Sequence, residues 1–277
     1  MNKVLKPAEI LEATSNIGVG KAKIPSARLL ILGVVAGAFI ALSAQGSNMA
    51  AFNLLAEPNT FGLGKLVSGF VFSAGLIFVL IAGAELFTGD MLMFVAYYDR
   101  KIALAQLVKT LVIVYIGNFI GSLLIVWMVN MSGQLSSAGN MLAARTILIA
   151  NGKVNLSFVQ AFTLGILCNW LVCIGVWMSF GSDSQVGKML SAFFPVMLFV
   201  TSGFEHSIAN MYYIPAGILA KANPDYLQVT GKGLEELSNL NWLGFFAKNL
   251  LPVTLGNIIG GVIFVSTLYW YSYKNDR

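Results

Sequence analysis

Long apolar runs separated by short polar segments dominate the chain. We expect six membrane-spanning runs, at residues 29–44, 66–98, 110–131, 156–180, 189–220 and 249–271. An α-helix of about 20 apolar residues crosses the hydrocarbon core of a bilayer. The segments 45–65 and 132–155 are more polar or are punctuated by Gly, Pro and Asn, which predicts loops. The pattern therefore indicates an all-α polytopic membrane protein with six transmembrane helices.

Two of the six runs are interrupted. The second run is broken at residues 85–90, and the fifth is broken at residues 204–206, where Glu205 stands beside the only histidine of the chain, His206. Ionisable residues at bilayer depth are costly, usually face a cavity, and mark a transport path. Interrupted helices in corresponding halves of a membrane protein point to the substrate pathway.

The two halves of the chain echo each other. Three pairs of short motifs recur in the same order: Leu32-Gly33 with Leu164-Gly165, Gly83-Ala84-Glu85 with Gly203-Phe204-Glu205, and residues 115–121 with residues 254–260. Three spans per half is an odd number, so the two repeats must be inverted in the membrane. We expect one transmembrane domain over residues 1–277, with repeats at 28–131 and 154–271 after an N-terminal segment, 1–27.

Composition agrees with a membrane protein. The chain is 57% hydrophobic and 10% charged, with a mean hydropathy of +0.77. Its net charge of +5 includes no basic stretch interleaved with base-stacking aromatic residues, which favours contact with lipid over nucleic acid. Cys168 and Cys173 lie in one apolar run without a nearby His or carboxylate, so we expect them to pack between helices. No metal or other cofactor is expected.

The positive charges predict the orientation. Six spans put both termini on one side, and that side carries eleven of the Lys and Arg residues: Lys3, Lys6, Lys21, Lys23, Arg28, Arg100, Lys101, Lys109, Lys188, Lys274 and Arg277. The other side carries six: Lys65, Arg145, Lys153, Lys221, Lys232 and Lys248. Positive residues accumulate in cytoplasmic loops, so both termini are expected in the cytoplasm. Residues 1–27 have the pattern of an amphipathic helix lying weakly anchored on the membrane surface.

The broken helices offer a site for an anion. Their unpaired backbone amides and positive dipole ends point toward the membrane centre. Lys153, just before the fourth span, could draw anions into a vestibule, although an ordinary interfacial lysine is the simpler interpretation. Glu85 and Glu205 are expected to stabilise the breaks by accepting backbone amides.

Thr88 and His206, one from each break, are expected to meet near the pseudo-two-fold axis. A threonine hydroxyl can accept a hydrogen bond from one imidazole nitrogen and so fix the tautomer. A structural histidine bonded to a carbonyl is the alternative. Phe72 and Leu76 before the first break and Phe199 before the second are candidate gates, or simple packing residues.

At these positions the sequence resembles the formate/nitrite transporter family, whose members conduct formate, nitrite or hydrosulfide. The motifs that carry the resemblance are GAELFTG at 83–89, LCNWLVC at 167–173, GFEHSIANM at 203–211 and LPVTLGNIIGG at 251–261. The resemblance implies an aquaporin-like homopentamer with one pore per protomer in the cytoplasmic membrane of a prokaryote. Asp90 departs from the family pattern, since other members often carry Asn, Ser or His there.

The resemblance also implies roles by position. Thr88 and His206 form a central pair with Asn210 nearby, and Lys153 and Asn169 lie at the periplasmic vestibule. The residues implied to narrow the path are Phe72, Leu76, Leu86 and Phe199.

The leading hypothesis is a channel for small monovalent anions, with formate first. Residues 249–261 look more like formate members, whereas residues 44–54 resemble a hydrosulfide branch, so nitrite and hydrosulfide remain alternatives. An intramembrane hydrolase is a poor alternative. Ser207 and His206 would point about 100° apart on a helix, and no HExxH or GxSxG motif is present. We therefore do not expect an enzyme or catalytic residues. Conduction of water or gas is a third option.

The hypothesis about the transport mechanism rests on His206. An anion that crosses apolar rings loses its hydration, and a neutral acid avoids most of that cost. His206 is the only side chain with an unperturbed pKa near neutrality. We expect it to exchange a proton with the substrate at the pore centre.

Overall fold

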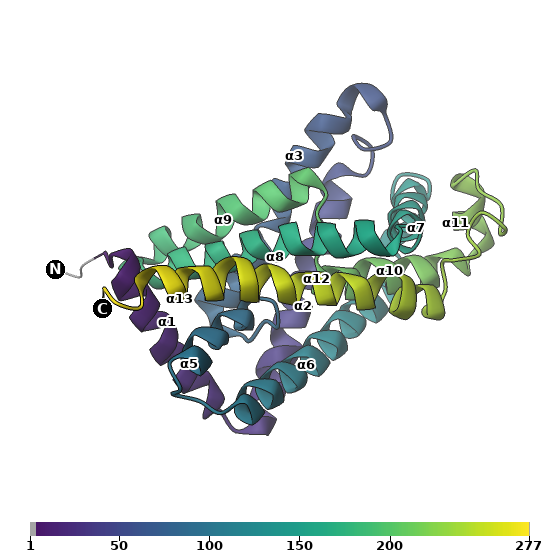
Figure 1. Ribbon diagram of the computed structural model, residues 1–277. Helices are drawn as coiled ribbons and strands as arrows, with labels where there is room; N and C mark the ends of the chain where they lie inside the picture. Colours follow the sequence, from purple (N-terminus) through teal and green to yellow (C-terminus); the bar gives the residue numbers. More distant parts are fainter. Residues whose placement is uncertain (1–3, 277) are drawn as a thin grey trace.

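The structure is a computed structural model that describes residues 4–276, and this part of the chain is helical without strands. Six helices are long and apolar enough to cross a membrane, which confirms the expected number (Figure 1). Spans 1, 3, 4 and 5 are the single helices α2 (Ser26–Ala51), α6 (Leu104–Met131), α8 (Phe158–Phe180) and α9 (Gln185–Ser202). Span 2 joins η1 (Pro58–Thr60), α3 (Phe61–Phe72), α4 (Ala74–Phe78) and η2 (Val79–Gly83). Span 6 joins η5 (Gly244–Leu250), α12 (Leu251–Gly261), η6 (Val262–Thr267) and α13 (Leu268–Tyr273).

Shorter helices complete the chain. Helix α1 (Pro7–Ala22) precedes the first span. After the break in the second span the chain continues as η3 (Gly89–Met93) and α5 (Phe94–Tyr98), and after the break in the fifth as α10 (Ser207–Lys221). The connections contain η4 (Gln134–Ser136), α7 (Met141–Val154) and α11 (Pro224–Val229). Both predicted interruptions are thus present, and each is a short non-helical segment between two helical pieces.

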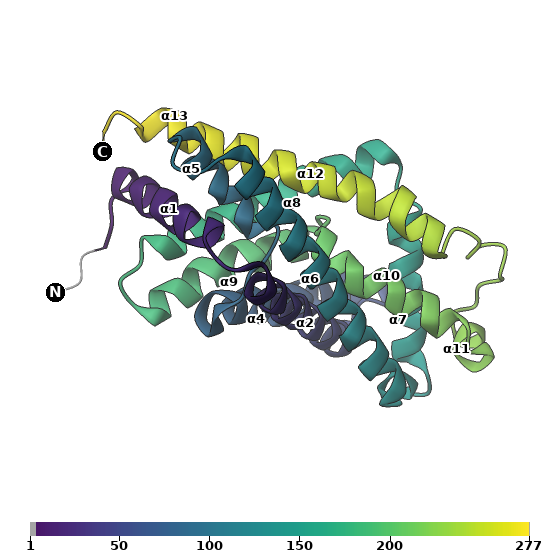
Figure 2. The ribbon, with the colours of Figure 1, turned by 90° about the horizontal axis from the view of Figure 1, so that it is seen from below.

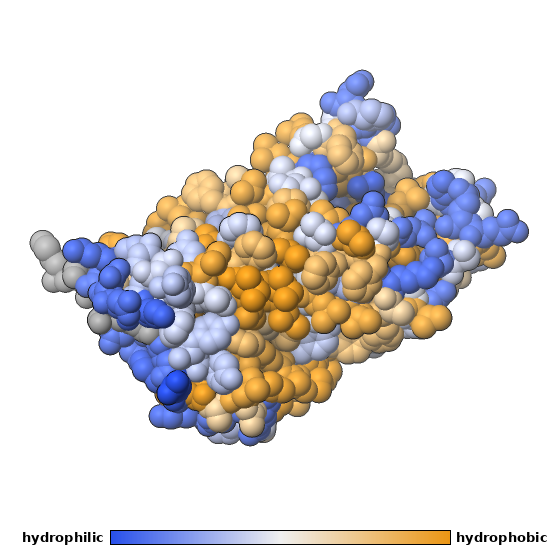
Figure 3. All heavy atoms as spheres, viewed as in Figure 1, coloured by the Kyte–Doolittle hydropathy of each residue, from blue (hydrophilic) through white to orange (hydrophobic). Residues whose placement is uncertain are grey.

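The surface follows the expected lipid contact. On α6, large apolar side chains such as Ile116, Ile120 and Trp127 are exposed, whereas Asn118 and Ser122 are buried. Figure 3 shows an apolar belt across the middle of the molecule with hydrophilic residues at both ends. A helix bundle with its polar groups inside and an apolar outside is the arrangement that a bilayer requires.

The two halves have opposite directions in the membrane. Helix α1 marks one end of the bundle, where the amide of Leu5 donates to Gly181 at the end of α8, 3.0 Å away. At the same end, Asp99 just before α6 accepts from Ser15 of α1 (2.6 Å) and from the indole of Trp270 in α13 (2.7 Å). Spans 1 and 3 therefore begin where spans 4 and 6 end. Figures 1 and 2 show the first and last helices, α1 and α13, at this end.

Close helix crossings in both halves depend on glycine. Helix α2 packs on α6, and α8 packs on α12. A Cβ added at Gly37 would overlap the backbone of Asn118, and one at Gly256 would overlap the carbonyl of Phe162. Small residues let membrane helices approach backbone to backbone, where packing and hydrogen bonds drive association.

Two predicted loops are partly helical. Helix α2 continues through Ala51, because the polar residues that suggested a loop are buried and bonded inside the protein: Gln45 accepts from Tyr212 at 2.6 Å, and Asn48 donates to Thr146 at 2.8 Å. Residues 132–155 contain α7, whose buried face includes Ile147 and Ala150. The loop prediction there was wrong because α7 packs as a short helix against α10 rather than spanning the membrane.

Candidate functional site

Two glycines end the helices at the breaks. Gly83 has φ +85° and Gly203 has φ +77°, and an L side chain is disfavoured in this left-handed region. Beyond them, the amide of Glu85 donates to the carbonyl of Leu32, and the amide of Glu205 donates to that of Leu164, both at 3.3 Å. The two breaks are therefore built alike, on the motifs that repeat in the sequence.

Two buried asparagines hold the breaks. Asn118 donates to the carbonyls of Gly33 (2.8 Å) and Glu85 (3.0 Å) and accepts from the amide of Phe87 at 3.0 Å. Asn257 repeats the arrangement in the other half. It donates to the carbonyls of Gly165 (2.8 Å) and Glu205 (2.9 Å) and accepts from the amide of Ser207 at 2.9 Å. The side-chain oxygens that accept the orphaned amides of Phe87 and Ser207 are thus those of the asparagines, not the glutamates.

Thr88 and His206 come together from the two breaks. The Oγ1 atom of Thr88 lies 2.9 Å from Nε2 of His206. The amide of Ala209 donates to Nδ1 of the same ring at 3.2 Å. Because Nδ1 accepts, the hydrogen-bond network assigns the proton of the neutral imidazole to Nε2, which donates to Thr88. Both side chains are buried.

The four candidate constriction residues surround one side of this pair. The rings of Phe72 and Phe199 meet edge to face with their centroids 5.9 Å apart, and the ring of Phe199 lies 5.9 Å from that of His206. Leu76 and Leu86 complete an apolar space of about 10 Å³ beside His206. A cavity needs about 10–15 Å³ to hold one water, so a hydrated ion does not fit here.

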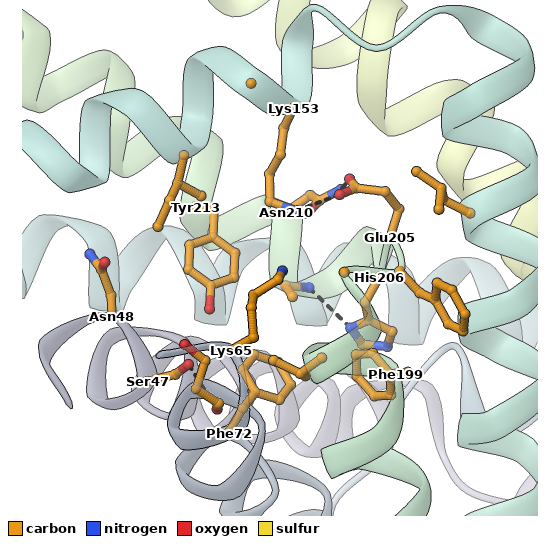
Figure 4. A pocket seen from close by; sticks show the side chains of 18 of the residues that line it. Ser47, Asn48, Lys65, Phe72, Lys153, Phe199, Glu205, His206, Asn210 and Tyr213 are labelled. Atoms are coloured by element: carbon orange, nitrogen blue, oxygen red, sulfur yellow. Dashed lines mark hydrogen bonds and ion pairs between the residues drawn. The ribbon is translucent and has the colours of Figure 1, made fainter. Parts of the chain in front are cut away.

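A larger cavity of about 350 Å³ lies beyond the phenylalanine rings. Figure 4 shows Lys153 and Glu205 on its wall, with His206 and Phe199 at the inner end. Lys153 Nζ lies 2.7 Å from one carboxylate oxygen of Glu205. The other oxygen accepts from Asn210 at 2.7 Å and from Asn249 at 3.2 Å. The cavity therefore joins a charged wall to the rings of Phe72 and Phe199 and to the imidazole of His206, which also lines the apolar space.

The sequence profile described as Formate/nitrite transporter matches residues 8–271. The chain belongs to the formate/nitrite transporter family. One relative, the formate channel FocA of Escherichia coli (strain K12), is 39% identical over 280 residues, which is 99% of this chain and 96% of the relative. A probable formate transporter of Methanothermobacter thermautotrophicus is 37% identical and covers 98% of this chain and 97% of its own length.

Solved structures agree with this membership. One, described as a pentameric formate channel with formate bound, has a TM-score of 0.80 at 36% identity and covers 90% of this chain and 98% of that chain. Another, described as an FNT family ion channel, has a TM-score of 0.80 at 26% identity, covering 95% and 98%. The protein is thus a multi-pass membrane protein of a family whose relatives are channels and transporters rather than enzymes.

Asn169 has a different place from the one that the resemblance to the formate/nitrite transporter family implied. It is buried, and it does not line the larger cavity. Its amide donates to the carbonyls of Thr88 (3.1 Å) and Asn257 (2.7 Å), and Cys173 also points its thiol at the Thr88 carbonyl, 3.3 Å away. Asn169 therefore positions the central threonine rather than the vestibule.

The opposite end of the pathway carries a lysine that sequence reasoning missed. Lys21 of α1 lies 2.5 Å from Glu85 and 2.5 Å from Asp90, the residue that departs from the pattern of the formate/nitrite transporter family. Burial alone would lower the pKa of Lys21, but the carboxylates of Asp90 and Glu85 outweigh it and raise the pKa above its usual value of 10.5. In each break the glutamate thus forms an ion pair with a lysine: Glu85 with Lys21 and Glu205 with Lys153.

Helix α1 is also more firmly held than an amphipathic surface helix. Leu11 and Ser15 are fully buried, and Gly18 approaches the backbone of Met93. The expectation of weak anchoring was therefore wrong. The feature of the sequence that could have indicated this docking is Lys21, a lysine in the last turn of the helix.

Proposed function

We propose that this chain forms a homopentameric channel for small monovalent anions, with formate as the leading substrate. The channel lies in the plasma membrane of a prokaryote, with both termini in the cytoplasm. The names of the relatives and of the pentameric structure support the substrate and the assembly. The charge distribution supports the orientation.

The observation that carries the proposal is the order of environments along one path. A cavity of about 350 Å³ with cationic residues in its wall opens toward an apolar space of only about 10 Å³. Cations concentrate anions at the mouth, and the apolar ring excludes hydrated ions. His206 lines both the cavity and the apolar space, and Thr88 lies 2.9 Å from its Nε2 atom.

His206 lowers the desolvation cost of the anion by transferring a proton to it. A formate ion stripped of water by Phe72, Leu76 and Phe199 has no fixed counter-charge inside the ring, whereas formic acid is neutral. A proton that enters from the acidic solution and binds Nδ1 displaces the hydrogen bond from Ala209, and its transfer to formate leaves the imidazole neutral again and lets that bond re-form. Exchange at the pore centre, directly or through water, lets the substrate cross as the acid.

Replacing His206 with Asn tests this mechanism. The variant keeps hydrogen-bonding groups but cannot titrate. We expect it to assemble normally and to lose proton-coupled formate uptake at low external pH by about tenfold or more, equivalent to at least about 1.4 kcal/mol of barrier. Passive anion efflux should persist. Formate and proton fluxes are measured together in proteoliposomes.

The control is Thr88→Ser, which retains the hydroxyl beside Nε2 and should retain coupled flux. A wild-type stoichiometry and pH profile in His206→Asn would leave His206 as a structural bridge. Wild-type flux of formate, nitrite, hydrosulfide and chloride, compared side by side with water permeability, decides the substrate. Water flux without anion flux would overturn the channel assignment itself.

A further inference from the structure

The larger cavity holds more positive than negative charge. Three cationic side chains line it, Lys65, Arg145 and Lys153, against one carboxylate, Glu205. Glu205 is already bound by Lys153 at 2.7 Å. Within residues 4–276, neither Lys65 nor Arg145 forms an ion pair with a carboxylate. Lys65 and Arg145 therefore keep two positive charges that an anion bound in the cavity would neutralise.

Arg145 is the more specific of the two. Its guanidinium is partly buried on α7, and its Nε atom is buried without a hydrogen-bond partner. Burial lowers the pKa of Arg145, but arginine starts so high that it stays charged. A partly desolvated cation without a counter-ion is costly, and an anion in the cavity would offset that cost.

Helix α7 holds Arg145 in place. The next residue, Thr146, accepts from Asn48 of α2 at 2.8 Å and donates to the carbonyl of Leu142 at 2.8 Å. A Cβ added at Gly217 of α10 would overlap Ala150 of α7, so the two helices are in close contact. The base of the arginine side chain is thus fixed by packing and hydrogen bonding, which lowers the ordering cost of binding.

We infer that Arg145, assisted by Lys65 from α3, forms an outer subsite that selects planar anions with two oxygen atoms, the class of carboxylates and nitrite. The inference rests on the proposed channel function and assigns its selectivity to this cavity. A guanidinium can donate two parallel hydrogen bonds to such an anion. A chloride or a hydrosulfide ion has no pair of oxygen atoms to accept two parallel hydrogen bonds, and gains only the attraction of the charge.

Two variants separate the effect of the Arg145 charge from the effect of its planar pair of hydrogen-bond donors. Arg145→Lys keeps the charge and removes the planar pair of donors, whereas Arg145→Gln removes both. The half-saturation concentration for formate uptake and the ratio of formate to hydrosulfide flux are measured in proteoliposomes with pentamers checked by size. Lys248→Gln is the matched control, since Lys248 carries the same charge at the same end of the molecule but binds Asn239 at 2.6 Å and does not line the cavity.

We expect Arg145→Lys to raise the half-saturation concentration for formate and nitrite about tenfold, the equivalent of losing about one charge-assisted hydrogen bond. Hydrosulfide should change less than twofold in the same variant. Arg145→Gln should weaken all the anions, and Lys248→Gln should resemble wild type. An unchanged formate-to-hydrosulfide ratio in Arg145→Lys would overturn the subsite.

A second measurement tests the subsite without any substitution, in case the Arg145 variants do not assemble. Formate-dependent protection of Lys65 against an amine-reactive reagent, in the otherwise unmodified protein, should exceed protection by chloride at equal concentration. Equal protection would also overturn the inference. Failure of the wild-type protein to pass any of the anions would instead overturn the proposed function, so the two failures are distinguishable.

Discussion

At the scale of single residues, the site is held together by contacts between segments that lie far apart in the sequence. Thr88 and His206 could be paired from the two breaks, and the structure brings them within 2.9 Å. The partner of Glu205 could not be predicted, because Lys153 is 52 positions away on a helix that looked like a loop. The polar bonds of Asn169 likewise depend on which backbone carbonyls the fold brings near it.

Lys153 should act through its charge. Lys153→Glu would place a second carboxylate beside Glu205, and the like charges would repel incoming anions. We expect formate flux to fall about tenfold or more, the change that about 1.4 kcal/mol produces, whereas Lys153→Arg should keep most of the flux.

Flux is measured in proteoliposomes, with Lys153→Gln as the neutral comparison. The Gln variant should lie between the other two, since Asn210 and Asn249 still bind Glu205. A Glu variant that assembles and conducts formate at the wild-type rate would contradict a vestibule role for Lys153.

At the scale of the elements, the interrupted spans were predictable and the short helices were not. A break in a long apolar run is visible because charged residues and glycine stand inside it, as at Gly83 to Asp90. Helix α7 was missed because its residues are mixed in polarity and its apolar face is short. The last turns of α2 were missed because polar side chains such as Gln45 and Asn48 form hydrogen bonds with other helices, which periodicity cannot reveal.

The docking of α1 depends on Lys21. Lys21→Gln would leave the carboxylates of Glu85 and Asp90 facing each other without a cation, and breaking a buried pair in this way costs about 3–5 kcal/mol. We expect a clear fall in the thermal unfolding midpoint of the detergent-solubilised protein. Adding Asp90→Asn to the same chain should recover part of the loss, because one uncompensated charge is removed.

The pH dependence of this docking has a definite sign. The pKa of Lys21 is raised above 10.5, so its stabilising contribution is fully present below the unfolded value and is lost only as pH rises through the folded value. The part of the stability difference between wild type and Lys21→Gln that comes from the titration of the lysine should therefore begin to fall only above about pH 10. Equal stability of Lys21→Gln and wild type would show that α1 is held by its apolar contacts alone.

At the scale of the whole molecule, the inverted repeat was predictable from three pairs of motifs. The structure gives their reason, since Asn118 and Asn257 hold equivalent carbonyls in the two halves. The asymmetry between the halves was not predictable. One glutamate is bound by a lysine of the N-terminal helix and the other by a lysine of the connection between the repeats.

The orientation of the molecule in the membrane stays a prediction. Helices α1 and α13 lie at the same end (Figure 1), and the side expected to carry the termini has eleven of the 17 Lys and Arg residues in the sequence. Two of the eleven, Lys3 and Arg277, lie outside the described residues. The excess of positive charge predicts that this end faces the cytoplasm.

Single cysteines at the two ends can test the orientation. Asn275→Cys marks the end with the termini and Ser238→Cys the opposite end, both at exposed positions. Cys168 and Cys173 are fully buried, so they should contribute little background. In intact cells a membrane-impermeant maleimide should label Ser238→Cys and spare Asn275→Cys, and both should react once the membrane is permeabilised. The reverse pattern in intact cells would mean that the larger cavity, with Arg145 in its wall, opens to the cytoplasm. The cavity would then concentrate anions for exit from the cell rather than for entry.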